Sequence, residues 1–99
     1  MAKIVWRDRA VRHLEAISEY LRARSPRAAE RYVSELGISV ASLAEFPEKG
    51  RQFDKRRRVL IFRNHLILYV VDLRTDSVFI ADIIDGRRDI PSVIRYLSD

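Results

Sequence analysis

The stretch VFIADIIDGRRDIP, residues 78–91, decides the fold and raises the question of function. Apart from Asp82, its first seven residues are apolar, which is typical of a buried strand. The strand then runs directly into Asp-Gly-Arg-Arg-Asp and a proline, which predicts a charged turn. A core strand that ends in Arg87 and Arg88 is compatible with a nuclease, with an inhibitory binding protein, or with a small domain that has a charged surface.

Two further strands precede this one. The runs RRRVLIF (56–62) and HLILYVVDL (65–73) are separated by the dipeptide RN, and the tripeptide RTD separates the second run from SVFIADII (77–84). Such short connections predict successive antiparallel hairpins, so the three strands are expected to form a meander.

The first half of the chain predicts a strand and two helices. KIVW (3–6) is expected to form the strand, and Asp8 is expected to cap the helix that follows. Ser25 is predicted to cap a second helix, with Pro26 at its first position, where a missing N–H costs nothing. The apolar side of the first helix is expected to contain Ala10, Leu14, Ile17 and Leu21, and that of the second Ala29, Tyr32, Val33, Leu36, Val40 and Leu43.

These elements predict an α+β fold in a single domain, residues 1–99. It has an N-terminal strand, an antiparallel helical hairpin, a three-stranded antiparallel meander and a short C-terminal helix within DIPSVIRYLSD (89–99). The second helix is expected to stop near Phe46 and Pro47. A chain of 99 residues is large enough for one hydrophobic core and too small for two.

Composition excludes several kinds of site. The chain has no cysteine, so it cannot form a disulfide or a thiolate metal site, and this fits a reducing cytoplasm, where we expect the protein. Its two histidines, His13 and His65, have no acid at ligand spacing, and neither a phosphate-binding glycine loop nor a nucleophile elbow is present. We therefore expect no metal, no cofactor and no membrane segment.

The net charge of +5 is unevenly distributed. Residues 1–48 hold eight basic against seven acidic residues, whereas residues 49–99 hold eleven against seven. The run KRRR (55–58) is interpreted either as a charged strand edge that discourages aggregation or as a patch that binds phosphates or acids. Arg63, Arg87 and Arg88 lie at strand ends and are expected to converge there, although Arg87 can also form a turn salt bridge with Asp85 or Asp89.

Asp82 interrupts an apolar strand, so a buried carboxylate is expected. A pairing with one of the arginines is favoured over a catalytic acid.

The order of elements and four segments give the chain a resemblance to a known family. The segments are SPRAAERYVSEL (25–36), LAEFPEKGR (43–51), RNHLILYVVD (63–72) and IIDGRRDI (83–90). In these the chain resembles the RelE/ParE superfamily of type II toxin–antitoxin toxins, most closely its ParE branch. The resemblance covers nearly the whole chain and implies the RelE/ParE-like toxin fold and a cognate antitoxin, ParD-like or similar.

The two branches of this superfamily differ in chemistry. RelE-like toxins cut messenger RNA in the ribosomal A site with basic residues and commonly a tyrosine, whereas ParE-like toxins inhibit DNA gyrase. Arg88 matches an arginine of the nuclease branch, but Leu66 and Ile94 fall where that branch has a second arginine and the tyrosine. Tyr96 is a poor substitute, because two helical residues rotate a side chain by about 200°.

The resemblance therefore favours a gyrase inhibitor without catalysis of its own. The alternative is a ribosome-dependent mRNA endonuclease, and a third possibility is an inactive member that only represses transcription with its antitoxin. DNA contact is expected only indirectly, through the toxin–antitoxin complex. The expected target-binding residues are Arg57, Arg58, Arg87, Arg88 and Arg95, the nuclease alternative would use Lys55, Arg63 and Arg88, and the antitoxin would contact Tyr20, Leu21 and Tyr32.

Overall fold

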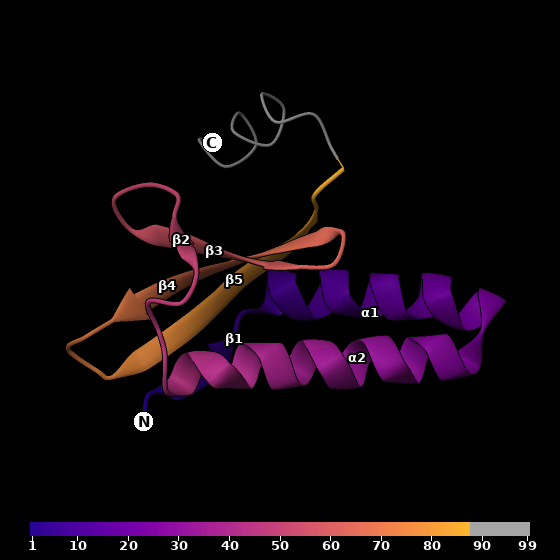
Figure 1. The fold of residues 1–99 in the computed structure, drawn as a ribbon, viewed down its shortest axis with the longest axis horizontal. Helices are drawn as coiled ribbons and strands as arrows, with labels where there is room; N and C mark the ends of the chain where they lie inside the picture. Colours follow the sequence, from indigo (N-terminus) through magenta and orange to yellow (C-terminus); the bar gives the residue numbers. More distant parts are fainter. Residues whose placement is uncertain (88–99) are drawn as a thin grey trace.

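The computed structural model describes residues 1–87 and shows two antiparallel helices packed on one face of a twisted sheet (Figure 1). The sheet has five strands in the order β1-β5-β4-β3-β2. The elements are β1 (Lys3–Trp6), α1 (Asp8–Arg24), α2 (Pro26–Ala41), a 3-10 turn η1 (Ser42–Ala44), β2 (Arg51–Gln52), β3 (Arg57–Phe62), β4 (His65–Asp72) and β5 (Ser77–Asp85). The predicted last helix, in residues 89–99, lies outside the described residues.

The predicted meander is confirmed. β3 pairs with β4 and β4 with β5, both antiparallel, while β1 joins the far side of β5 in parallel. The two-residue strand β2 extends the opposite edge by pairing with β3, and the sequence pattern did not predict it. A register shift between Leu68 and Tyr69 bends the β4–β5 ladder.

The core lies between the helices and the sheet. Three of the predicted helix positions, Ala10, Leu36 and Val40, are buried against strand residues that include Ile67 and Ile80. The apolar stripes of both helices therefore face the sheet, as their spacing predicted.

Of the two predicted helix caps, one is confirmed and one is wrong. Ser25 caps α2 as predicted, because its side chain accepts a hydrogen bond from the backbone N–H of Ala28, with Pro26 as the first helical residue. The cap predicted at Asp8 is wrong: Arg7 occupies that position without a side-chain hydrogen bond, and Asp8 is the first residue of α1. Its carboxylate still lies in the first turn, where the helix dipole favours negative charge.

Candidate functional site

Two basic residues of the nuclease alternative, Lys55 and Arg63, lie at opposite ends of β3. Lys55 precedes this six-residue strand and Arg63 follows it, so roughly 20 Å of extended chain separates the two. The structure therefore does not bring Lys55 and Arg63 together, because an extended strand holds its two ends apart. Arg88, the third member, and Arg95, an expected target contact, lie outside the described residues.

Arg63 and Arg87 do lie at the same end of the sheet. The β3–β4 turn meets the end of β5 there, because the backbone N–H of Gly86 donates to the carbonyl of Asn64 at 2.7 Å. A Cβ at position 86 would lie 2.9 Å from that carbonyl oxygen, which explains the glycine before the arginine pair. Arg63 itself has a positive φ of 53° and forms an ion pair with Glu35 of α2.

Arg87 forms the turn salt bridge that the sequence allowed. Its Nε lies 3.2 Å from Oδ1 of Asp85, and its backbone N–H donates to the same oxygen at 3.0 Å. The hydrogen bond from the Arg87 side chain holds the pKa of Asp85 below its ordinary value. The Arg87 side chain is nevertheless 70% exposed, so its guanidinium can still reach a partner.

A buried aromatic cluster supports this end of the sheet. The hydroxyl of Tyr32 lies 2.8 Å from Nδ1 of His65, and the Tyr32 ring packs edge-on against Phe62. Burial raises the pKa of Tyr32 to about 12 and lowers the pKa of His65. Burial therefore disfavours the charged form of both groups.

The residues expected to bind the antitoxin differ in how far they are exposed to solvent. Tyr32 is only 4% exposed and packs in the hydrophobic core, which argues against the expectation that the antitoxin contacts it. Tyr20 is 57% exposed on α1, with the Arg24 guanidinium 4.5 Å from its ring centroid. Leu21 is half-buried and packs against the core.

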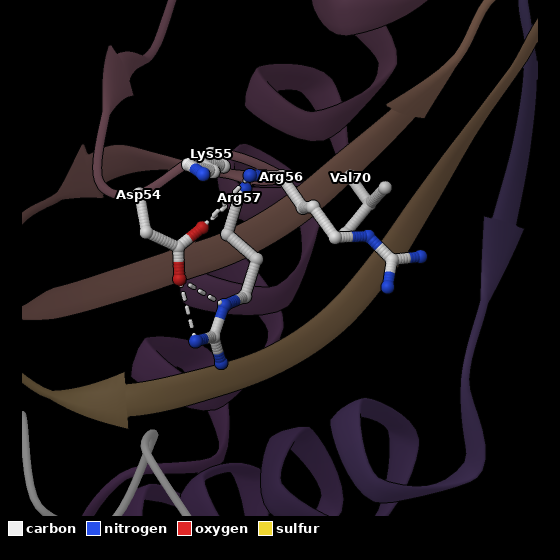
Figure 2. A pocket seen from close by; sticks show the side chains of 5 residues that line it. All are labelled: Asp54, Lys55, Arg56, Arg57 and Val70. Carbon is white, nitrogen blue, oxygen red and sulfur yellow. Dashed lines mark hydrogen bonds and ion pairs between the residues drawn. The ribbon is translucent and has the colours of Figure 1, made fainter.

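The basic residues at the start of β3 lie close to the carboxylate of Asp54. Its Oδ1 accepts hydrogen bonds from the backbone N–H groups of Arg56 and Arg57, and its Oδ2 accepts from Nε of Arg57 at 2.7 Å (Figure 2). The Arg57 hydrogen bond lowers the pKa of Asp54. Arg58 turns inward, because its guanidinium donates to the backbone carbonyl of Gly50 at 2.8 Å.

Two of the expected target contacts are thus engaged within the chain. Arg57 is held by Asp54, and Arg58 is held by the loop that contains Gly50. A hollow of about 540 Å³ lies beside them and is lined by Asp54, Lys55, Arg56, Arg57 and Val70.

One short polar contact, between β5 and α1, was not predicted. Asp82 is 2% exposed, and its Oδ1 lies 2.5 Å from Nδ1 of His13 on α1. The sequence indicated a buried carboxylate but favoured an arginine as its partner. His13 gave no signal because 69 residues separate the two positions.

No metal centre or membrane helix is found in the part of the chain that the structure describes. No three of its histidine and acidic side chains are grouped so that they could hold a metal ion. None of the helices within residues 1–87 combines the length and the apolar character needed to cross a membrane.

Comparison with known proteins decides the family. The protein-family model that describes the ParE toxin of the type II toxin–antitoxin system parDE matches residues 4–90. The chain belongs to this toxin family. The ParE-family chain is also 33% identical to the protein Y4kP of Sinorhizobium fredii over 94 residues, which cover 93% of the chain and 96% of Y4kP.

Other relatives carry the RelE name. The ParE-family chain is 43% identical over 61 residues to toxin RelE2 of Caulobacter vibrioides, a match that covers 62% of the chain and 69% of RelE2. Its fold is similar to that of the isolated Escherichia coli RelE toxin, with a TM-score of 0.65 over 99% of this chain and 98% of RelE. It is also similar to the RelBE toxin–antitoxin complex, with a TM-score of 0.64 over 89% of this chain and 100% of the matched chain. Both structural matches are 13% identical and establish the shared fold alone. The chain is therefore a type II toxin of the RelE/ParE superfamily, as the sequence predicted.

Proposed function

We propose that this ParE-family toxin inhibits DNA gyrase by binding to it, and that a cognate antitoxin silences it. The observation that supports this most is the separation of Lys55 from Arg63 by the length of β3. Cleavage of RNA needs a base that activates the 2′-hydroxyl and cations that hold the same phosphate. Cations at two ends of a strand supply binding surfaces instead of one reaction centre.

The position of Leu66 supports the same proposal. This residue is the second of the middle strand β4, where the nuclease branch would present an arginine, and its partner on β5 is Ile84. An apolar pair at this point offers no stabilisation to a pentavalent phosphate. Inhibition through protein–protein contact needs no such group.

The end of β5 is the proposed contact with gyrase. Arg87 is exposed there and is held at a fixed place by Asp85 and by the close approach of Gly86 to Asn64. Arg88 follows directly in the sequence. Residues that are fixed before binding lose less conformational entropy in the complex, which favours a recognition role for this pair.

The antitoxin is proposed to cover the exposed side of the helical hairpin. Tyr20 and Val11 are exposed on α1, and Ile38 is exposed on α2. One of the solved structures with this fold is a toxin–antitoxin complex, RelBE, and this supports the binding of an antitoxin here. Apolar side chains left on a helix surface are the usual anchors for an amphipathic partner segment.

A second candidate function is cleavage of ribosome-bound messenger RNA. The observation that favours it is the 43% identity to a protein named RelE2. It would require a catalytic set other than Lys55 with Arg63.

Both functions are separated by two parallel assays on the purified toxin. In the first, gyrase acts on supercoiled DNA and cleaved DNA is quantified; in the second, translating ribosomes are supplied and cuts in the messenger RNA are mapped. We expect cleaved DNA to accumulate and the messenger to stay whole. Codon-specific cuts with unaffected gyrase would transfer the assignment to the nuclease branch. Inactivity in both assays would favour the third alternative, an inactive member that only represses transcription together with its antitoxin.

The double change Arg87→Ala with Arg88→Ala tests the contact surface. It should weaken gyrase inhibition by up to roughly a hundredfold, because a charged contact contributes about 1 to 3 kcal/mol. Antitoxin binding should persist if the antitoxin uses Tyr20 and its apolar neighbours. Arg74→Ala, in the exposed β4–β5 turn, is a matched control that removes an arginine at the other end of β5.

A further inference from the structure

Nearly all of the net positive charge lies in one short segment. Residues 51–58 hold five of the chain's 19 basic residues and one of its 14 acidic residues, so the other 91 residues hold 14 basic against 13 acidic. The rest of the molecule is therefore close to neutral. The segment forms β2, the following loop and the start of β3, at the edge of the sheet.

The single acid of this segment is neutralised inside it. Both oxygens of Asp54 accept hydrogen bonds from the Arg57 backbone and side chain, and the backbone N–H of Phe53 donates to the Arg57 carbonyl. These bonds fix the loop, so that Lys55 and Arg56 are held at its exposed tip. Because the loop is ordered before binding, less entropy is lost when a ligand arrives.

Three cations of the segment remain available to a ligand. Arg51, Lys55 and Arg56 are exposed, and no acidic side chain within residues 1–87 lies within salt-bridge distance of them. Figure 2 shows the side chains of Arg56 and Arg57 extending in different directions, that of Arg57 toward Asp54, and both arginines line the hollow together with Val70. Phe53 adds a partly exposed aromatic ring, whose centroid lies 5.8 Å from the Arg57 guanidinium.

We propose that this basic segment, residues 51–58, binds the phosphodiester backbone of a nucleic acid directly. Closely spaced cations with an adjacent aromatic ring are the combination that nucleic-acid grooves use, since phosphates pair with the cations and bases stack on the ring. Arginine suits phosphate because its planar fork matches two phosphate oxygens. An acidic protein surface has lower and less regular charge density, so it fits this segment less well. The inference does not depend on gyrase being the target.

The test measures binding of the full-length toxin to fluorescently labelled duplex DNA and to single-stranded RNA of equal length, over a series of salt concentrations. The variant Arg51→Gln, Lys55→Gln, Arg56→Gln removes the three available cations. Its matched control, Arg12→Gln, Arg27→Gln, Arg31→Gln, removes three exposed arginines from α1 and α2 and leaves the same net charge.

We expect the segment variant to bind at least tenfold more weakly at low salt and the control variant to bind nearly as well as the original chain. For duplex DNA, affinity falls as salt rises, and the slope of log affinity against log salt concentration should become shallower by about 2 to 3 in the segment variant. Each lost phosphate contact contributes about 0.9 to this slope. Stronger binding to one probe identifies that nucleic acid as the ligand, and equal binding indicates recognition of the backbone alone.

The proposal would be overturned if neither probe bound at low salt, or if both triple variants weakened binding equally. It would also be overturned if poly-glutamate bound as tightly as the nucleic acids and the segment variant abolished that binding. Circular dichroism checks that both variants fold. If the segment variant does not fold, Arg51→Glu with Arg56→Glu and Arg51→Lys with Arg56→Lys replace it, and only the charge reversal should abolish binding.

Discussion

The carboxylate of Asp82 on β5 lies 2.5 Å from Nδ1 of His13 on α1, and this contact connects the first helix to the sheet. The same carboxylate oxygen accepts the backbone N–H of Ile83 at 2.8 Å. β1 covers the edge of β5 only from Ser77 to Ile80, so this contact holds the helix against the part of β5 beyond β1. A buried carboxylate in an apolar strand is tolerated because it is paired.

Replacement of His13 by Ala should therefore destabilise the fold. The change leaves the buried Asp82 without its histidine, and losing a partner of a charged group costs about 1 to 3 kcal/mol. The free energy of unfolding is measured by urea denaturation. Arg12→Ala is the control, since Arg12 is exposed on the same helix and its loss should change stability by about 0.5 kcal/mol or less. Equal effects of the two changes would show that the pair contributes nothing.

The sequence predicted the parts of the fold that follow from local patterns. Runs of apolar residues located the three strands of the meander, and Ser25 with Pro26 located the start of α2, because these signals lie within a few neighbouring residues. The two-residue strand β2 has no pattern of its own and exists because β3 offers it a partner. The missed cap at Asp8 is an error of one residue, which is usual for helix ends.

The site was harder to predict, because its contacts join distant residues. Arg63 and Lys55 are both basic and lie near each other in the sequence, yet an extended strand puts them at opposite ends of the sheet. Conversely, His13 and Asp82 are 69 residues apart and touch. Residue type indicated what each group can do, whereas only the register of the sheet decides which groups meet.

Gly50 should tolerate no side chain, whereas Gly37 should accept one. A Cβ at Gly50 would lie 2.7 Å from the hydroxyl of Tyr69, which accepts the Gly50 N–H and donates to the carbonyl of Pro47. Gly50→Ala would break this network around a fully buried tyrosine and should cost about 1 to 3 kcal/mol. Gly37→Ala, in the interior of α2 with nothing within 4 Å, should stabilise by about 0.5 to 1 kcal/mol. Thermal unfolding of both variants checks the opposite signs, and a stabilised Gly50→Ala protein would contradict the prediction.

Mild acid should weaken the fold through His65. Burial lowers the pKa of His65 in the folded chain below its ordinary value of 6.5, so the unfolded chain takes up the proton more readily. The contribution of His65 to stability is complete above pH 6.5 and is lost as the pH falls from there through the lower folded-state pKa. Denaturation midpoints measured from pH 7.5 to 5.5 should therefore decline more for the original chain than for His65→Gln. Between pH 8 and 9 the two proteins should show the same pH dependence, and equal declines in acid would argue against a role for His65.

Ile83 and Ile61 allow the burial pattern of the sheet to be tested with one type of substitution. Ile83 is 2% exposed on β5, where it lies opposite Ile67, whereas Ile61 is 61% exposed on β3, which β4 separates from β5. Ile83→Asp would place an unpaired charge in the core, at a cost of several kcal/mol that approaches the whole stability of a small domain. The variant should be unfolded by circular dichroism at room temperature. Ile61→Asp exposes its carboxylate to water and should keep the native spectrum, with a Tm lowered by only a few degrees. A native spectrum and an unchanged Tm for Ile83→Asp would show that β5 is not an inner strand, and the placement of Arg87 at its rigid end would then lose its basis.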